Sequence, residues 1–161
     1  MKRLFALAAA LLLLFSLTSC GIHDYADFYY CRKDYIYESQ QSVIEAESRE
    51  VTGHAQDLSY LLALYLMGPL EENLQSPFPS GTHLVSIAQE GTSLTIQLSR
   101  QVETLSDSEF SLACACMAMT CLEIDSLTDI TITSEEKSLT INRDLLMLSD
   151  NISTESTNGG N

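Results

Sequence analysis

The N-terminal segment of the chain has the pattern of an export signal, which would be removed before the rest of the chain folds. A basic pair, Lys2 and Arg3, precedes an almost wholly apolar run over residues 4–17. As a helix, this run would extend about 21 Å, which is short of the roughly 30 Å hydrocarbon core of a bilayer. The pattern therefore predicts a cleaved export signal, residues 1–19, rather than a transmembrane anchor.

The end of this run has the sequence Leu17-Thr18-Ser19-Cys20. It resembles the lipobox of bacterial lipoproteins, in which the chain is cut before the cysteine and the cysteine thiol is acylated. The resemblance implies that Cys20 carries palmitate-type chains and holds the protein at the cell membrane, on its extracytoplasmic face. Two or more acyl chains give stable attachment, whereas a single chain gives only marginal binding. The alternative is an ordinary secretory signal with a chance cysteine.

The acidity of the chain excludes two classes of partner. Its net charge is −14, and removal of residues 1–19 leaves six basic against 22 acidic residues. Nucleic-acid binding depends on Lys and Arg that neutralise phosphates, so no nucleic-acid partner is expected. A polybasic patch for membrane surfaces is excluded for the same reason. Because 45% of the residues are hydrophobic, the chain has enough apolar material for a folded domain.

One domain is expected between two less structured ends. Residues 20–27 are interpreted as a tether, and residues 28–148 as the domain. Residues 149–161 are polar, rich in Ser, Thr, Asn and Gly, and have no apolar periodicity. A disordered tail is therefore predicted for them.

Strands and a helix are predicted for the first half of the domain. Two strand candidates, 28–31 and 43–51, precede a helix over 58–65 in which leucines recur at helical spacing. Gly68 and Pro69 follow as a glycine cap and a helix breaker, so the helix is expected to end there.

The second half repeats this order. Residues 83–89 and 94–98 alternate apolar with polar side chains and predict a hairpin. A capping-box pattern at 106–109 opens a second helix. Short apolar segments at 130–132 and 139–141 predict a closing hairpin. The order ββ-α-ββ-α-ββ indicates an α+β fold, with one mixed sheet and two helices packed on one face of it.

The second helix carries an apolar stripe that is predicted to face the sheet. Its members are Phe110, Ala113, Cys114, Met117, Cys121 and Ile124. The other face, with Leu112, Ala115, Cys116 and Met119, is less polar than a solvent-exposed helix face usually is. We therefore expect a partner protein or a neighbouring copy of the chain to cover that face in part.

Three segments of the domain share the order and spacing of one known family. They are Glu47–Val51, the helix end Met67–Pro69, and the Ser-Pro-Phe-Pro-x-Gly-Thr loop over 76–82. Together with the strands and helix that follow, they resemble the GerMN domain, the sporulation and spore-germination module. The resemblance extends over about residues 28–134.

The resemblance implies a fold like the ring-building motif of secretion systems and a role in protein assembly without a catalytic site. It implies an envelope or sporulation-channel protein as partner, or a second copy of the chain. The family occurs in lipoproteins of spore-forming bacteria, in agreement with a lipidated Cys20. This chain has one copy of the domain where the best-studied members have two. It also has Ser134-Glu135-Glu136 where a glycine usually follows the last family strand.

Several conspicuous side chains have a structural interpretation beside a functional one. Pro77, Pro79 and Gly81 are interpreted as turn residues, with partner recognition as the alternative. Glu47 and Arg49 are interpreted as a solvated ion pair worth less than about 1 kcal/mol, with a partner contact as the alternative. A group of tyrosines fits either an interface or a half-buried edge strand. These are Tyr25, Tyr29, Tyr30, Tyr35 and Tyr37.

The cysteines beyond Cys20 are interpreted as small core residues. Cys114 and Cys116 point about 200° apart around the helix, so they cannot share a tetrahedral metal site. Cys114 and Cys121 lie about 10.5 Å apart along it, beyond the reach of a disulfide. A pair between Cys31 and a helix cysteine is left open.

No catalytic motif is recognised. The sequence has no His-Glu-x-x-His, no Gly-x-Ser-x-Gly and no phosphate-binding glycine loop. We therefore expect a non-enzymatic protein without metal or cofactor. The alternative is an envelope lipoprotein that binds a ligand or uses a thiol of the cysteine-rich helix for catalysis. That alternative requires an exposed cysteine with a lowered pKa.

Overall fold

The computed structural model describes residues 24–34, 42–123, 126–144 and 146. The export signal, Cys20 and the predicted tail at 149–161 lie outside the described residues. So does Ile124 of the predicted helix stripe.

The first sheet has three strands in the order β2-β1-β3. They are β1 (Tyr25–Arg32), β2 (Ile44–Glu50) and the two-residue β3 (Leu74–Gln75), and both partners run antiparallel to β1. The tether assignment was too long, because Tyr25, Ala26 and Asp27 pair with β2 and belong to β1.

The second sheet has four strands in the order β4-β5-β6-β7. They are β4 (Leu84–Glu90), β5 (Ser93–Leu98), β6 (Asp129–Thr133) and β7 (Ser138–Asn142). The sheet is mixed, because β5 and β6 are parallel and the two outer pairs are antiparallel. Side chains alternate along β5 and β6, and the apolar ones on one face are buried.

Three helical segments connect the strands. Helix α2 (Leu58–Leu66) begins at Asp57, whose carboxylate accepts a hydrogen bond from the N–H of Tyr60. A short 3-10 helix, η1 (Arg100–Thr104), follows β5, and α3 (Asp107–Leu122) follows η1. The predicted capping box at the start of α3 is confirmed: Ser106 and Glu109 bond each other's backbone N–H.

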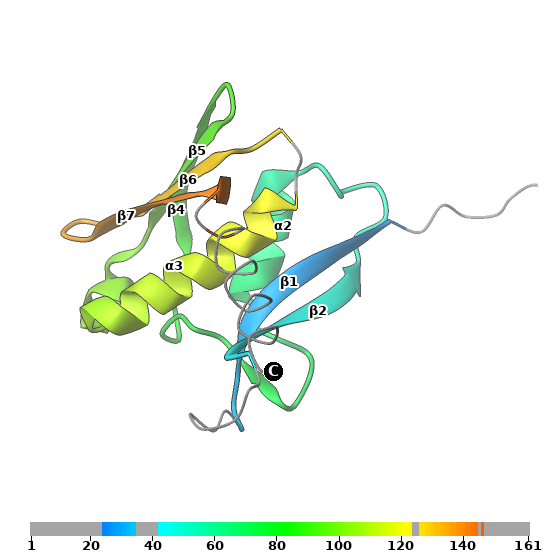
Figure 1. Ribbon diagram of the computed structural model, residues 1–161, viewed down its shortest axis with the longest axis horizontal. Coiled ribbons are helices and arrows are strands. Elements are labelled where there is room, and N and C mark those ends of the chain that lie inside the picture. Colours follow the sequence, from blue (N-terminus) through cyan, green and yellow to red (C-terminus); the bar gives the residue numbers. More distant parts are fainter. Residues whose placement is uncertain (1–23, 35–41, 124–125, 145, 147–161) are drawn as a thin grey trace, which may run out of the picture.

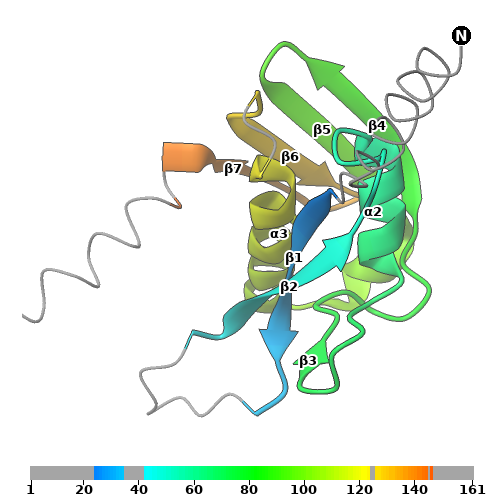
Figure 2. The ribbon, with the colours of Figure 1, turned by 90° about the vertical axis from the view of Figure 1, so that its right-hand side faces the viewer.

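The two α-helices, α2 and α3, lie between the two sheets (Figures 1 and 2). The predicted α+β class is confirmed, but a single sheet with both helices on one face is wrong. The reason is the composition of α3, which is apolar on most of its circumference. A helix of that kind is buried on opposite sides, and here α3 contacts β1 on one side and β6 and β7 on the other.

The second face of α3, which was expected to be exposed, is covered in part by the chain itself. Cys116 is completely buried, and Leu112, Ala115 and Met119 are half-buried. Beside them, the hydroxyl of Thr120 accepts a hydrogen bond from the N–H of Tyr29 on β1, at 3.0 Å. β1 packs on the part of this face that holds Cys116 and Thr120, whereas Leu112, Ala115 and Met119 keep part of their surface exposed.

Aromatic side chains hold α2 against the first sheet. The rings of Tyr30 and Tyr65 stack with centroids 4.8 Å apart, and Phe28 lies 6.5 Å from Tyr65. The Tyr30 hydroxyl donates to the backbone oxygen of Tyr65, at 3.0 Å.

Within the part of the chain that the structure describes, no helix has the length and apolar character needed to cross a membrane.

Candidate functional site

The segment that follows α2 exposes apolar side chains in a fixed conformation. We call residues Met67–Leu70 the Met67–Leu70 loop. Met67 is 81% exposed and Leu70 79% exposed, more than any other large apolar side chain that the structure describes. Gly68 between them has φ +89°, a conformation that L side chains rarely adopt. The glycine thus turns the chain sharply at the end of the helix, as the sequence predicted.

Glu47 on β2 holds the far end of this loop. Its Oε2 accepts hydrogen bonds from the N–H groups of Leu70, at 2.8 Å, and Glu71, at 2.7 Å. The carboxylate is only 3% exposed. Hydrogen bonds to a charged acceptor are about twice as strong as neutral ones, so this contact fixes the backbone of the loop.

Arg49, two residues further along β2, holds the near end. Its guanidinium donates to the backbone oxygen of Gly68, at 2.7 Å, and to that of Leu64, at 3.3 Å. It also donates to the Tyr30 hydroxyl and forms an ion pair with Glu47. The guanidinium carbon lies 5.0 Å from the ring centroid of Phe28, within cation–π range.

The predicted solvated ion pair is therefore wrong, because Glu47 and Arg49 are both buried. Burial raises the pKa of Glu47, but the N–H of Glu71, the Arg49 guanidinium and the N–H of Leu70 outweigh it and leave the pKa below its ordinary value. One sequence signal could have revealed the burial. Positions 47, 49 and 51 share one face of the strand, and Val51 is apolar.

The proline-rich loop has the structural role that its turn residues indicate. Phe78 is buried and packs edge-on against Tyr65. Thr82 closes the turn, because its N–H and its hydroxyl both donate to the backbone oxygen of Pro79, at 3.1 and 2.8 Å. This geometry supports the turn interpretation over a partner-recognition loop.

The three described tyrosines of this group do not gather on one surface. Tyr30 is buried in the core, Tyr29 is half-buried and Tyr25 is 62% exposed. Tyr35 and Tyr37 lie outside the described residues. β1 is the central strand of its sheet, so the edge-strand interpretation does not hold for the three described tyrosines.

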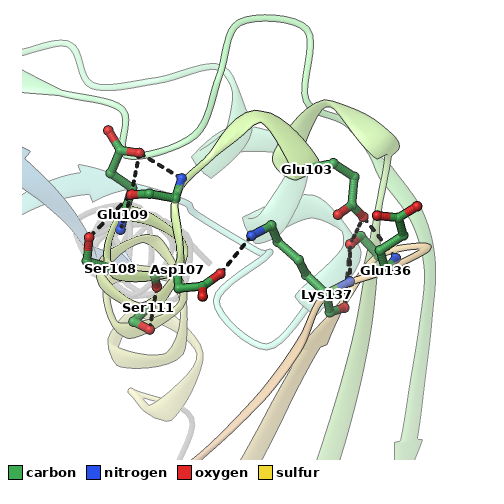
Figure 3. Close-up of polar contacts among 9 residues, drawn as sticks. Glu103, Asp107, Ser108, Glu109, Ser111, Glu136 and Lys137 are labelled. Atoms are coloured by element: carbon green, nitrogen blue, oxygen red, sulfur yellow. Dashed lines mark hydrogen bonds and ion pairs between the residues drawn. The ribbon is translucent and has the colours of Figure 1, made fainter.

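A second polar cluster ties the β6–β7 turn to the start of α3 (Figure 3). Glu103 on η1 accepts hydrogen bonds from the hydroxyl of Ser134 and from the N–H of Glu136. Lys137 pairs with Asp107, at 3.2 Å, and lies 5.6 Å from the ring centroid of Phe110. Through its hydroxyl, Ser134 thus anchors the β6–β7 turn to η1.

The four described cysteines are all free thiols and buried. Burial raises the pKa of Cys114 and of Cys121 to about 12. Cys31 differs, because its hydrogen bond with the Cys116 thiol lowers its pKa. Among the residues with described positions, no three His, Cys, Asp or Glu side chains are grouped to hold a metal ion.

Comparison with known protein families identifies the domain. Residues 27–140 match the Germane family model, described as sporulation and spore germination. The chain belongs to the Germane family. The resemblance to GerMN domains inferred from the sequence is thereby confirmed, and the Glu47–Arg49 pair and the Met67–Leu70 loop lie inside the matched Germane domain. No curated protein matches the chain significantly.

Solved structures of GerMN domains share the fold of the Germane domain at low sequence identity. The tandem GerMN domains of the sporulation protein GerM from Bacillus subtilis match with a TM-score of 0.53 and 16% identity, over 74% of this chain and 43% of that one. The first GerMN domain of the same protein matches with a TM-score of 0.50 and 11% identity, over 72% and 86%. A candidate lipoprotein from Clostridium perfringens matches with a TM-score of 0.48 and 20% identity, over 74% and 89%.

Proposed function

We propose that this chain is a membrane-anchored extracytoplasmic lipoprotein whose Germane domain binds another envelope protein. In this proposal it is a non-catalytic assembly factor in sporulation or spore germination. Its partner is an envelope or sporulation-channel protein, or a second copy of the chain. The family description supports the process, and the sequence ending in Cys20 supports the anchor.

The observation that carries the proposal is the Met67–Leu70 loop. Apolar side chains in solvent lose free energy on burial, about 1.5–3 kcal/mol for a residue the size of Leu or Met. A loop already fixed in one conformation loses little further entropy when a partner binds it. Glu47 and Arg49 provide that fixation with two hydrogen bonds to the loop, one to the preceding helix and one to Glu71, which follows the loop.

Three carboxylates with lowered pKa values support a non-catalytic role. Glu47 is occupied by the loop, Glu103 by the β6–β7 turn and Glu109 by the helix cap. Each of these carboxylates thus accepts hydrogen bonds that hold part of the fold in place. A thiol enzyme is less well supported, because it needs an exposed thiolate. Among the four described cysteines only Cys31 has a lowered pKa, and its side chain is 5% exposed.

The test is affinity capture after crosslinking in spore-forming cells that express the full chain. The double variant Met67→Ser/Leu70→Ser removes both exposed apolar side chains of the loop. The matched control, Tyr25→Ser/Val85→Ser, removes two others, which are 62% and 54% exposed and lie on β1 and β4. We expect the loop variant to lose the crosslinked partner several-fold at unchanged thermal stability, and the control to retain it. Equal recovery from both variants would overturn the role of the loop.

A further inference from the structure

Two cysteines from distant parts of the sequence meet inside the domain. Cys31 on β1 and Cys116 on α3 are 85 residues apart in the chain, and their sulfur atoms lie 3.9 Å apart. Both side chains are buried. We propose that Cys31 and Cys116 are a disulfide-forming pair, oxidised by exchange with an external disulfide, and that the bond fastens β1 to α3.

The pairing is specific to these two thiols. Cys114 and Cys121 lie on the same helix and are equally buried, but neither has a second cysteine as a hydrogen-bond partner in the described structure. Cys114 points about 200° away from Cys116 around the helix axis. A disulfide needs sulfur atoms about 2.05 Å apart, so closure requires a movement of somewhat under 2 Å, within reach of rotamer changes at Cys31 and Cys116.

Cys31 is the more accessible thiol of the pair, because it lines a surface groove and is 5% exposed, whereas Cys116 is completely buried. The groove has a volume of about 230 Å³ and is lined by Cys31, by Gln75 and Ser76, and by Leu105 and Leu112. Cys116 is not part of its lining. The thiolate is the nucleophile in disulfide exchange. The hydrogen bond between the two thiols lowers the pKa of Cys31 and raises that of Cys116, which favours the thiolate at Cys31.

The order of the two exchange steps follows from this access. With oxidised glutathione as the external disulfide, the Cys31 thiolate attacks one of its sulfurs, breaks its S–S bond and releases one glutathione thiolate. The Cys116 thiol then loses its proton and attacks the Cys31 sulfur of the mixed disulfide, which releases the second glutathione. Two protein thiols are oxidised, one glutathione disulfide is reduced, and the two protons pass to the two glutathione thiolates.

The bond would restrict the unfolded chain strongly. A disulfide stabilises a protein mainly by limiting the unfolded ensemble, and more so when it closes a long loop. Disulfides persist outside the cytoplasm, so the occurrence of this bond in the cell rests on the extracytoplasmic location proposed above. The formation of the bond in the purified protein does not depend on that location.

The experiment incubates the purified full chain with oxidised glutathione under native conditions. Cys20→Ala is present throughout to remove that thiol. The remaining thiols are then alkylated in denaturant and counted by intact mass. We expect two of the four thiols to be lost, a higher melting temperature, and reversal by dithiothreitol. Four unmodified thiols, or a loss at other positions, would overturn the proposal.

Single variants test which thiols react and in which order. Cys116→Ala should stop at a glutathione adduct on Cys31, whereas Cys31→Ala should give no adduct on Cys116. Cys114→Ala is the matched control, because Cys114 is as buried as Cys116 and lies on the same helix. It should still lose two thiols, and circular dichroism shows that each variant is folded. Loss of two thiols in folded Cys116→Ala would contradict the pairing.

Discussion

Glu47 and Arg49 form an ion pair with both side chains almost removed from solvent, at 3% and 7% exposure. The desolvation of such a pair is costly. Here each charge is also used to bond backbone groups that follow α2: Leu70 and Glu71 for the carboxylate, Gly68 for the guanidinium. The two inward-facing side chains of β2 thereby fix the backbone of a loop about twenty residues away. We call the Glu47–Arg49 pair and its hydrogen bonds to this loop the clamp.

Breaking the clamp should cost a large part of the stability of the domain. Arg49→Met leaves Glu47 as a buried charge without its cation, and such losses cost about 3–5 kcal/mol. Arg32→Met is the control, because its partners Asp34 and Glu45 are 61% and 39% exposed and an exposed pair is worth about 0–1 kcal/mol. Urea unfolding of both variants measures the difference. Equal losses would mean that the buried pair is not special.

The same contact predicts acid sensitivity. Because the folded-state pKa of Glu47 lies below its ordinary value of 4.5, its stabilising contribution is complete above pH 4.5. It is lost as the pH falls through the folded-state value. Glu47→Gln should therefore flatten the decline in the free energy of unfolding below pH 4.5. Some decline should persist, because the pKa values of Glu103 and Glu109 are lowered by their own hydrogen bonds. An unchanged slope in Glu47→Gln would show that this carboxylate is not responsible.

The core of the domain depends on the buried side of α3. Met117 is completely buried, so Met117→Ala should cost about 2–5 kcal/mol, the usual penalty for this change in a core. Met119, two residues on, is only half-buried, and Met119→Ala should cost clearly less. Thermal melts compare the two directly, and the reverse order would contradict the described packing of the helix.

The anchor prediction concerns a residue outside the described structure. Acyl chains are attached through the thiol, so Cys20→Ala should abolish lipid attachment and move the protein from the detergent phase to the aqueous phase. Phase partitioning of both forms measures this. If the variant partitions into detergent as the natural chain does, the apolar run at 4–17 is itself the anchor.

Local patterns predicted the elements of the fold better than their arrangement. The capping box at Ser106 and the glycine at position 68 act within a few residues, so their outcomes are visible in the sequence. The division into two sheets depends on pairings such as β5 with β6, which bring together Leu94 and Ile130 across a whole helix. A local sequence pattern does not predict a pairing between strands that are so far apart in the chain. The two-residue strand β3 is likewise too short to leave a signal.

The candidate site escaped prediction for a related reason. Glu47 and Arg49 look like the solvated face of a strand, because the backbone groups that satisfy them come from residues 64–71. Family resemblance pointed to both segments separately, Glu47–Val51 and Met67–Pro69. That they bind each other required the structure.

The last prediction tests whether the clamp holds Gly68 in its unusual conformation. A Cβ at this position would meet no atom within 4 Å, so any cost of Gly68→Ala comes from the backbone, at φ +89°. For an L residue such conformations cost about 1–2 kcal/mol. In the Arg49→Met background the loop has lost the guanidinium that bonds the Gly68 oxygen and can relax, so the cost should shrink. A double-mutant cycle by urea unfolding gives the coupling between the two positions. Equal costs of Gly68→Ala in both backgrounds would mean that residues within the loop determine its conformation. Arg49 would then stabilise that conformation without determining it.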